Sequence, residues 1–289
     1  MGAERTRRFA PVILLGGAVL ALHFDDWARL LPRWWNDPNY SHGFFVPLFS
    51  LFFLWEKRAD LLSATPRPSW LGLPLLLFGV MVKLATAFYH SLFLSSASMV
   101  LTILGAVLLI WGREVFRITV VPLLFLLLML PLPLPLYERV ALPLQRLAAV
   151  ASTTLLQGAG VPALCEGNVI ELPERSLQVE EACSGIRSLT GFIALGVAFA
   201  YLARRPMWER VAIAASTVPI SVLMNVVRVL FTALLAYWNL DWLAKGTPHA
   251  ATSLVLFGVA ALILWGEYYV LSHLFVGERA ERTYEGGAP

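Results

Sequence analysis

Long apolar runs with few charged residues constrain this chain more than any other feature. A helix that crosses the hydrocarbon core of a bilayer needs about 20 predominantly apolar residues. Hydrophobic residues make up 58% of the chain and charged residues 14%, against about half and a quarter in soluble domains. We therefore predict an all-α integral membrane protein with about eight transmembrane helices, at residues 9–24, 42–55, 69–88, 91–111, 117–136, 185–203, 209–236 and 250–273.

Lys and Arg residues in the loops indicate how these spans are oriented, because short cytoplasmic loops carry an excess of both. With the N-terminus inside, the inner loops hold about twice as many of them as the outer loops. We expect a multi-pass protein of the cytoplasmic (inner) membrane with both termini cytoplasmic. Residues 1–276 are predicted to form one polytopic domain, followed by a disordered cytoplasmic tail at 277–289.

One long stretch between spans, about residues 137–183, is predicted to lie on the outer face. It follows a Leu-Pro repeat at 130–135, whose prolines interrupt a helix. Residues 137–157 carry apolar side chains at helical spacing with charges between them, which is typical of an amphipathic helix on a membrane surface. Residues 168–172 and 177–180 alternate apolar and polar side chains and predict a small β-hairpin.

A polar, reactive cluster from Glu181 to Arg187 stands where the hairpin meets the sixth span. Cys183 would lie just before a helix N-terminus, whose dipole favours a thiolate by about 0.3–1 kcal/mol. Arg187 follows about one helical turn later. Two structural alternatives remain open. Cys183 could be an inert buried thiol, or it could form a disulfide with Cys165, since disulfides are permitted on the outer face.

Arg228 is notable because it lies inside the seventh span. An arginine at such a depth costs about 2.5–3.5 kcal/mol on insertion scales, and these residues usually face the bundle interior and mark function. Asn225 precedes it by three residues and therefore shares its helix face. The structural alternative is an arginine that snorkels to the interface or pairs with a carboxylate such as Glu181.

His249 is predicted to lie at the outer mouth of the eighth span, level with Cys183. Thr247 is a suitable N-cap, and Pro248 suits the first helical position. His42 opens the second span on the same face and competes for the same role. Cysteine as nucleophile, histidine as acid and base, and arginine as oxyanion stabiliser together suit acyl transfer.

Other chemistries have no support in the sequence. No spacing of His, Cys, Asp or Glu suggests a metal site, and neither a phosphate-binding loop nor a Gly-x-Ser-x-Gly elbow occurs. The formal net charge of +3 reflects topology, because no basic stripe interleaved with aromatic residues is present. We therefore expect no cofactor and no nucleic-acid partner.

Several segments, taken in order along nearly the whole chain, resemble the exosortase/archaeosortase family. Glu166-Gly167-Asn168-Val169-Ile170 is similar to the family's approach to its cysteine. The signature motifs are Tyr40-Ser41-His42-Gly43-Phe44-Phe45-Val46-Pro47, Glu181-Ala182-Cys183-Ser184-Gly185-Ile186-Arg187, Asn225-Val226-Val227-Arg228, and His249 before the last span.

The resemblance implies a membrane-embedded cysteine transpeptidase. Its substrates would be membrane-anchored proteins with a C-terminal sorting signal: a short Pro-Glu-Pro-like motif, a transmembrane helix and a basic tail. On this pattern Cys183 forms the acyl-enzyme on the outer face, His249 is the acid–base and Arg228 the stabiliser. The acceptor would be an extracellular polysaccharide or a lipid. Supporting or substrate-binding residues would be Arg187, Glu181, Asn225, His42, Tyr40 and Ser184.

Two alternatives to this function follow from the same residues. A membrane cysteine protease that only hydrolyses its substrate would use the same acyl-enzyme, since water and an amine attack the same carbonyl. A non-enzymatic transporter or scaffold would instead use the Cys165–Cys183 pair as a structural disulfide. Cys165 lies outside the family pattern and therefore keeps this second alternative open.

Overall fold

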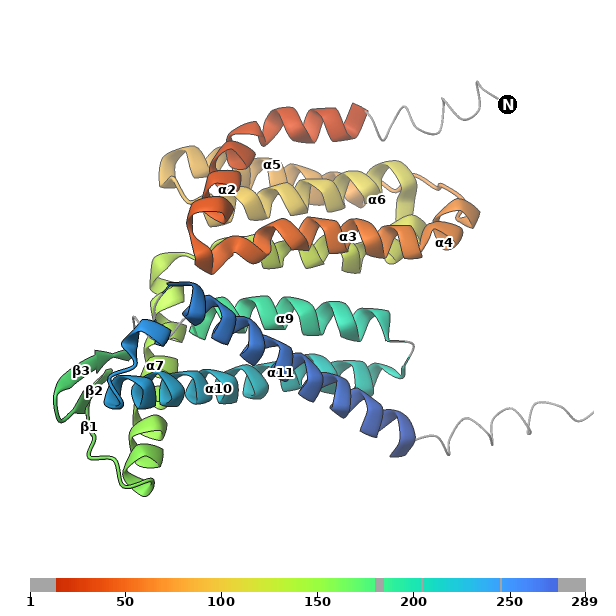
Figure 1. The fold of residues 1–289 in the computed structure, drawn as a ribbon. Helices are drawn as coiled ribbons and strands as arrows, with labels where there is room; N and C mark the ends of the chain where they lie inside the picture. Colours follow the sequence, from red (N-terminus) through yellow and green to blue (C-terminus); the bar gives the residue numbers. More distant parts are fainter. Residues whose placement is uncertain (1–13, 180–184, 204, 245, 275–289) are drawn as a thin grey trace, which may run out of the picture. The chain divides into compact units, whose positions relative to one another are not determined.

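The computed structural model describes residues 14–179, 185–203, 205–244 and 246–274. The chain divides into two compact units, Met1–Tyr137 and Glu138–Pro289, each with its own interior contacts. Both units are mainly helical, and the strands form one small sheet in the second unit (Figure 1). The predicted helical membrane class with a small sheet is therefore confirmed, while the location of the sheet on the outer face stays a prediction.

The N-terminal unit consists of helices joined by short connections. Residues 14–22 are helical and lead through His23 into the next helix. The remaining elements are α2 (Phe24–Asn36), η1 (Pro38–Phe44), α3 (Phe45–Glu56), α4 (Arg58–Ser63), α5 (Gly72–Tyr89), α6 (Leu92–Phe125) and η2 (Leu126–Met129).

Gly112 interrupts α6 and separates the predicted fourth and fifth spans. Its φ of 80° and ψ of −168° are non-helical, and a side chain there would be strained. A Cβ atom at this position would also lie 1.7 Å from the carbonyl oxygen of Arg67. The Arg67 backbone in turn donates a hydrogen bond of 3.1 Å to the Trp111 carbonyl. Glycine is therefore required here by both conformation and space.

Close backbone packing joins α5 to α6, which lie side by side (Figure 1). A Cβ atom on Gly105 would approach the backbone nitrogen of Leu76 to 2.3 Å. Small residues at helix contacts are typical of membrane proteins, where dispersion between closely approaching backbones favours association.

The fifth span ends earlier than the sequence predicts. The predicted end was residue 136, whereas α6 and η2 end at Met129 and the next helix begins at Leu134. Pro131 and Pro133 lack a backbone N–H group, so the helix stops before them. Pro135 then falls in the first turn of the next helix, where proline is tolerated.

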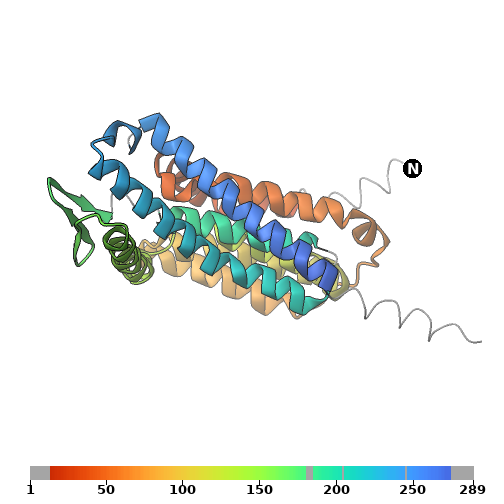
Figure 2. The ribbon, with the colours of Figure 1, turned by 60° about the horizontal axis from the view of Figure 1, so that its bottom comes forward.

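The C-terminal unit combines a three-stranded sheet with four α-helices and one short 3-10 helix in the described residues; Figure 2 shows the sheet beside the helices. Helices α9 and α11 both pack against α10, and α11 crosses α10 at an angle (Figures 1 and 2). The elements are α7 (Leu134–Gly158), β1 (Leu164–Glu166), β2 (Val169–Leu172), β3 (Arg175–Gln178), α9 (Gly185–Leu202), α10 (Met207–Tyr237), η3 (Asp241–Ala244) and α11 (Gly246–Leu274).

The predicted hairpin is present, with a tighter turn and one additional strand. Leu172 pairs with Arg175, so the connection between β2 and β3 contains two residues. β1 adds an antiparallel edge in the order β1-β2-β3, with Cys165 opposite Ile170. Three residues are too short a run for alternation to be recognised in the sequence, which is why β1 was missed.

Helix α7 packs with its small side chains inward. Ser152 donates a hydrogen bond of 3.2 Å to the Val226 carbonyl of α10. Leu147 and Val150, which belong to the apolar stripe expected from the sequence, are about half exposed. The buried side chains around this contact include Ala148, Ala149 and Leu156 of α7, Ile170 and Leu172 of the sheet, and Val229 and Ala233 of α10.

Four helical segments in the described residues are long and apolar enough to cross a membrane. They are Gly72–Tyr89, Leu92–Met129, Met207–Tyr237 and Ala251–His273, and Leu189–Leu202 forms a shorter apolar helix. The protein is therefore a multi-pass membrane protein. The count of eight spans, the inner location of both termini and the single domain over 1–276 remain predictions.

Candidate functional site

Cys183, the candidate nucleophile, precedes α9, and His249, the candidate base, lies in the first turn of α11. Both helices pack against α10. Helix α9 begins at Gly185, as predicted, two residues after Cys183. Helix α11 begins at Gly246, so His249 lies in its first turn. Cys183, Glu181 and Ser184 themselves lie outside the described residues, as do the side chains of Arg187 and His249.

Both short connections make α10 run opposite to α9 and α11. The N-termini of α9 and α11 therefore lie at the same end of the unit as the C-terminus of α10, Tyr237 (Figure 1). The backbone thus brings the segments that carry Cys183 and His249 to one end of a three-helix arrangement. That the two residues themselves lie level with each other stays a prediction.

Arg228 and Asn225 occupy a buried face of α10. Their exposed fractions are 3% and 5%. Arg228 lines a cavity of about 10 Å³, which has room for about one water molecule. The cavity wall also includes Phe192 of α9 and Phe257 of α11, whose rings meet edge to face. The sequence correctly predicted an arginine that faces the helix bundle rather than lipid.

Arg228 lies some distance along α10 from the end of the unit where α9 and α11 begin. It lies nine residues before the end of α10, which corresponds to about 14 Å along the helix axis. His249 lies only three residues into α11, or about 5 Å. Arg228 would therefore have to extend along the helices to reach chemistry at the mouth, as long cationic side chains can.

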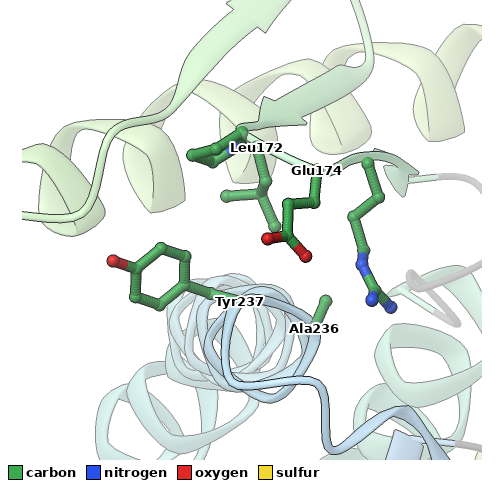
Figure 3. A pocket seen from close by; sticks show the side chains of 6 residues that line it. Leu172, Glu174, Ala236 and Tyr237 are labelled. Atoms are coloured by element: carbon green, nitrogen blue, oxygen red, sulfur yellow. The ribbon is translucent and has the colours of Figure 1, made fainter.

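A larger cavity of about 370 Å³ lies at the mouth end of the same unit, between the β2–β3 turn and the end of α10. The carboxylate of Glu174 points toward Ala236 and Tyr237 across this space (Figure 3). Arg175 lies in the cavity wall and donates a hydrogen bond to the Asn239 side chain just beyond the end of α10. The hairpin is therefore attached to α10 at the end where α9 and α11 begin.

Cys165 carries a free thiol on β1. Its sulfur lies 3.6 Å from the Gly167 carbonyl, and the side chain is partly buried against the core of the unit. The structural disulfide with Cys183 stays an alternative prediction, because Cys183 lies outside the described residues. The Cys165 side chain packs as a small hydrophobic group, the usual environment of an unreactive cysteine.

Tyr40 and His42 lie in the N-terminal unit. His42 makes a hydrogen bond of 3.1 Å between its Nε2 atom and the Leu128 carbonyl. Tyr40 is buried, with the guanidinium carbon of Arg33 located 5.3 Å from its ring centroid. Both residues have local packing partners, which favours structural roles for them within that unit.

Sequence reasoning missed two sets of polar residues. Ser216 of α10 donates a short hydrogen bond to the Glu267 carboxylate of α11, within two candidate spans. Ser221 lines the same cavity as Arg228 and precedes it on α10 by about two helical turns. The signals were a lone carboxylate in an apolar run and a seven-residue spacing between Ser221 and Arg228, which places both on one helix face.

A family model described as transmembrane exosortase matches residues 34–266, which is most of the chain and includes every motif segment described above. This chain belongs to the transmembrane exosortase family. The family comprises membrane transpeptidases that act on proteins with sorting signals. No curated protein and no solved structure matches the chain.

Proposed function

We propose that this exosortase family member is a cysteine transpeptidase that uses Cys183, His249 and Arg228. One observation carries the proposal: α9 and α11 start at the same end of the second unit, directly after Cys183 and just before His249. The buried Arg228 of the intervening helix supports it, because an intramembrane arginine is rarely retained without a role.

In the first step, the Cys183 thiolate attacks the carbonyl carbon of the scissile peptide bond. The carbon–sulfur bond forms and the carbon–nitrogen bond breaks, while protonated His249 gives its proton to the leaving amine. In the second step, the acceptor attacks the thioester and loses a proton to His249 as the carbon–sulfur bond breaks. Arg228 would stabilise the oxyanion of each tetrahedral intermediate, directly or through an ordered water.

The proposed substrate is a protein anchored in the membrane by a single C-terminal transmembrane helix, with a short Pro-Glu-Pro-like motif before that helix and a basic tail after it. Such an anchor fixes the depth of the scissile bond relative to the helix mouths. The cavity between the hairpin and α10 supports an extended chain approaching from the aqueous side. The site would face the periplasm or cell exterior, and the acceptor would be an extracellular polysaccharide or a lipid.

The test compares Cys183→Ala with Cys165→Ala, scored by processing of a membrane-anchored reporter that carries the sorting signal. We expect Cys183→Ala to abolish processing and Cys165→Ala largely to spare it, because Cys165 packs against the core. Equal loss in both variants would favour a structural disulfide. Thiol labelling of the native protein is the second measurement, and permanent oxidation of Cys183 would end the nucleophile assignment.

Hydrolysis alone is distinguished from transfer by the new C-terminus of the product. A conjugate at that terminus supports transpeptidation, whereas a free carboxylate as sole product in intact membranes supports a protease.

The role of the hairpin is tested by Glu174→Lys, which reverses the charge in the cavity between the turn and α10. Glu171→Lys is the matched control, because Glu171 lies on the same hairpin outside the cavity wall. We expect Glu174→Lys to raise the apparent KM several-fold with little change in kcat. Normal processing after deletion of the whole hairpin would contradict a role in substrate binding.

A further inference from the structure

A second polar site lies in the N-terminal unit, where α5 turns into α6. Lys83 of α5 donates hydrogen bonds to Asp25 at 2.7 Å, to Asp26 at 2.8 Å and to Ser95 at 3.0 Å. An ammonium group has three donors, so these contacts occupy all of them. Asp26 and Ser95 are buried, and the lysine is 10% exposed. An ionised cluster in an apolar unit points to a function beyond packing.

A cavity of about 340 Å³ opens beside this cluster. Its wall includes the charged side chains of Asp25 and Arg29 and the ring of His90. Asp25 is half exposed and bonded to both Lys83 and Arg29, the latter at 2.9 Å. Arg29 is also half exposed, and this bond uses one of its five N–H groups. The cavity therefore offers both a carboxylate and guanidinium donors at adjacent positions.

The carboxylate remains ionised at neutral pH. Burial raises the pKa of Asp25, but the hydrogen bond from Lys83 and the positive charges of Lys83 and Arg29 together outweigh this effect and leave the pKa below its ordinary value. Because Lys83 is already saturated, a ligand anion would bind to Arg29 and His90. A ligand cation would bind to the exposed oxygen lone pairs of Asp25.

Part of the remaining wall of the cavity is apolar. Leu22 and Leu84 line it, and Leu84 is 62% exposed. Phe24, Phe88 and Tyr89 are highly exposed beside it, at the start of α2 and the end of α5. Exposed aromatic residues at the ends of spans mark the membrane–water interface. A headgroup with attached acyl chains fits this combination of walls.

We propose that this cavity binds the headgroup of an amine-bearing phospholipid, of the ethanolamine type. The phosphodiester would accept hydrogen bonds from Arg29 and His90. The primary ammonium would donate to Asp25, and the acyl chains would lie against Leu22 and Leu84. An anionic headgroup without an amine would leave Asp25 facing negative charge, and a choline headgroup has no N–H group to donate.

The test measures retained phospholipid by native mass spectrometry of the full chain released from bilayers. Equal amounts of ethanolamine, choline and glycerol phospholipids are supplied. We expect the wild-type protein to retain one ethanolamine lipid roughly fivefold more readily than a choline lipid. Equal retention of the three lipids by the wild-type protein would overturn the proposal.

Two variants test the positive and the negative side chain of the cavity separately. Arg29→Gln should reduce retention of every phospholipid, whereas Asp25→Asn should remove the preference for the amine while phospholipid retention persists. Arg58→Gln and Asp60→Asn are the matched controls, because both residues lie on the exposed surface of α4. Size-exclusion profiles check that each variant is folded. Identical lipid retention in the folded variants and their controls would contradict the assignment.

A soluble headgroup separates lipid binding from simple phosphate binding. We expect phosphoethanolamine at millimolar concentration to leave the bound lipid in place, because it lacks the chains that contact Leu22 and Leu84. Displacement of the lipid by phosphoethanolamine at equal concentration would show that the apolar wall contributes nothing, and the lipid assignment would fall.

Discussion

Lys83 of α5 and Asp26 of α2 form a buried ion pair of 2.8 Å, reinforced by a hydrogen bond of 2.7 Å between Asp26 and His23. Burial opposes ionisation of Asp26, but the hydrogen bonds from His23, Lys83 and Ser95 outweigh it and lower its pKa to about 2. These contacts attach α2 to α5 through Lys83 and to α6 through Ser95. Removing one partner of such a pair leaves the other charge buried without compensation.

The free energy of unfolding should depend on pH through the carboxyl group of Asp26. Its folded pKa of about 2 lies below the ordinary value of 3.8, so its contribution is present above about pH 4 and is lost as the pH falls toward 2. The contribution corresponds to about 2 kcal/mol. We expect the stability difference between wild type and Asp26→Asn to shrink between pH 5 and 3, measured by unfolding in detergent. A pH-independent difference would contradict the assignment, and Asp60→Asn serves as the exposed control.

The contact between α5 and α6 should not tolerate one added methyl group at Gly105. A Cβ atom on Gly105 would lie 2.3 Å from a backbone nitrogen, so Gly105→Ala must separate the helices. We expect a loss of about 1–3 kcal/mol in the free energy of unfolding. Gly258→Ala is the matched control, because no atom lies within 4 Å of a Cβ there. It should be neutral or slightly stabilising, and equal destabilisation by both would refute the packing argument.

Arg228 should contribute to chemistry more than to thiol reactivity. We expect Arg228→Ala to lower processing by about 100-fold or more, as removal of an oxyanion donor does, and Arg228→Lys to restore part of it. Alkylation of Cys183 should proceed at a nearly unchanged rate. Arg210→Ala on the same helix is the control, since Arg210 donates to the Ala200 and Tyr201 carbonyls. Full processing by folded Arg228→Ala would exclude a catalytic role.

The two histidines near helix starts should differ in their effect. Loss of an acid–base group lowers rates by about 10²–10⁴-fold, which we expect for His249→Gln. His42→Gln retains a donor for the Leu128 carbonyl and should process normally. His42→Ala should cost about 1 kcal/mol of stability. Processing rates of the folded variants show which histidine is the acid–base group. A severe processing defect in His42→Gln would assign that role to His42 instead.

Hydrophobic periodicity and the length of apolar runs were sufficient to predict the elements that depend on neighbouring residues alone. The helical class, the start of α9 and the hairpin strands were predicted, because each depends on local pattern and on proline or glycine nearby. The prolines at 131 and 133 did mark a helix end, yet the helix stopped at Met129 rather than 136. A repeat of prolines identifies a break without saying which side of it remains helical.

The candidate site was predicted in part. The sequence alone identified Arg228 as an interior residue, since an arginine within an apolar run has few other options. Its depth relative to His249 depended on where α10 and α11 begin and end. Phe192 and Phe257, which close its cavity, look like ordinary apolar residues in the sequence, and only helix packing brings them to Arg228.

By itself, the sequence determined that this protein is a helical membrane protein with the motif order of the exosortase family, because burial of apolar runs and local motifs are properties of neighbouring residues. Tertiary structure alone decided which faces of α7 and α10 meet, that Lys83 is saturated by Asp25, Asp26 and Ser95, and that a cavity with both charges opens beside them. Such contacts join residues far apart in the chain, and their geometry depends on helix rotation and side-chain packing, which periodicity leaves open.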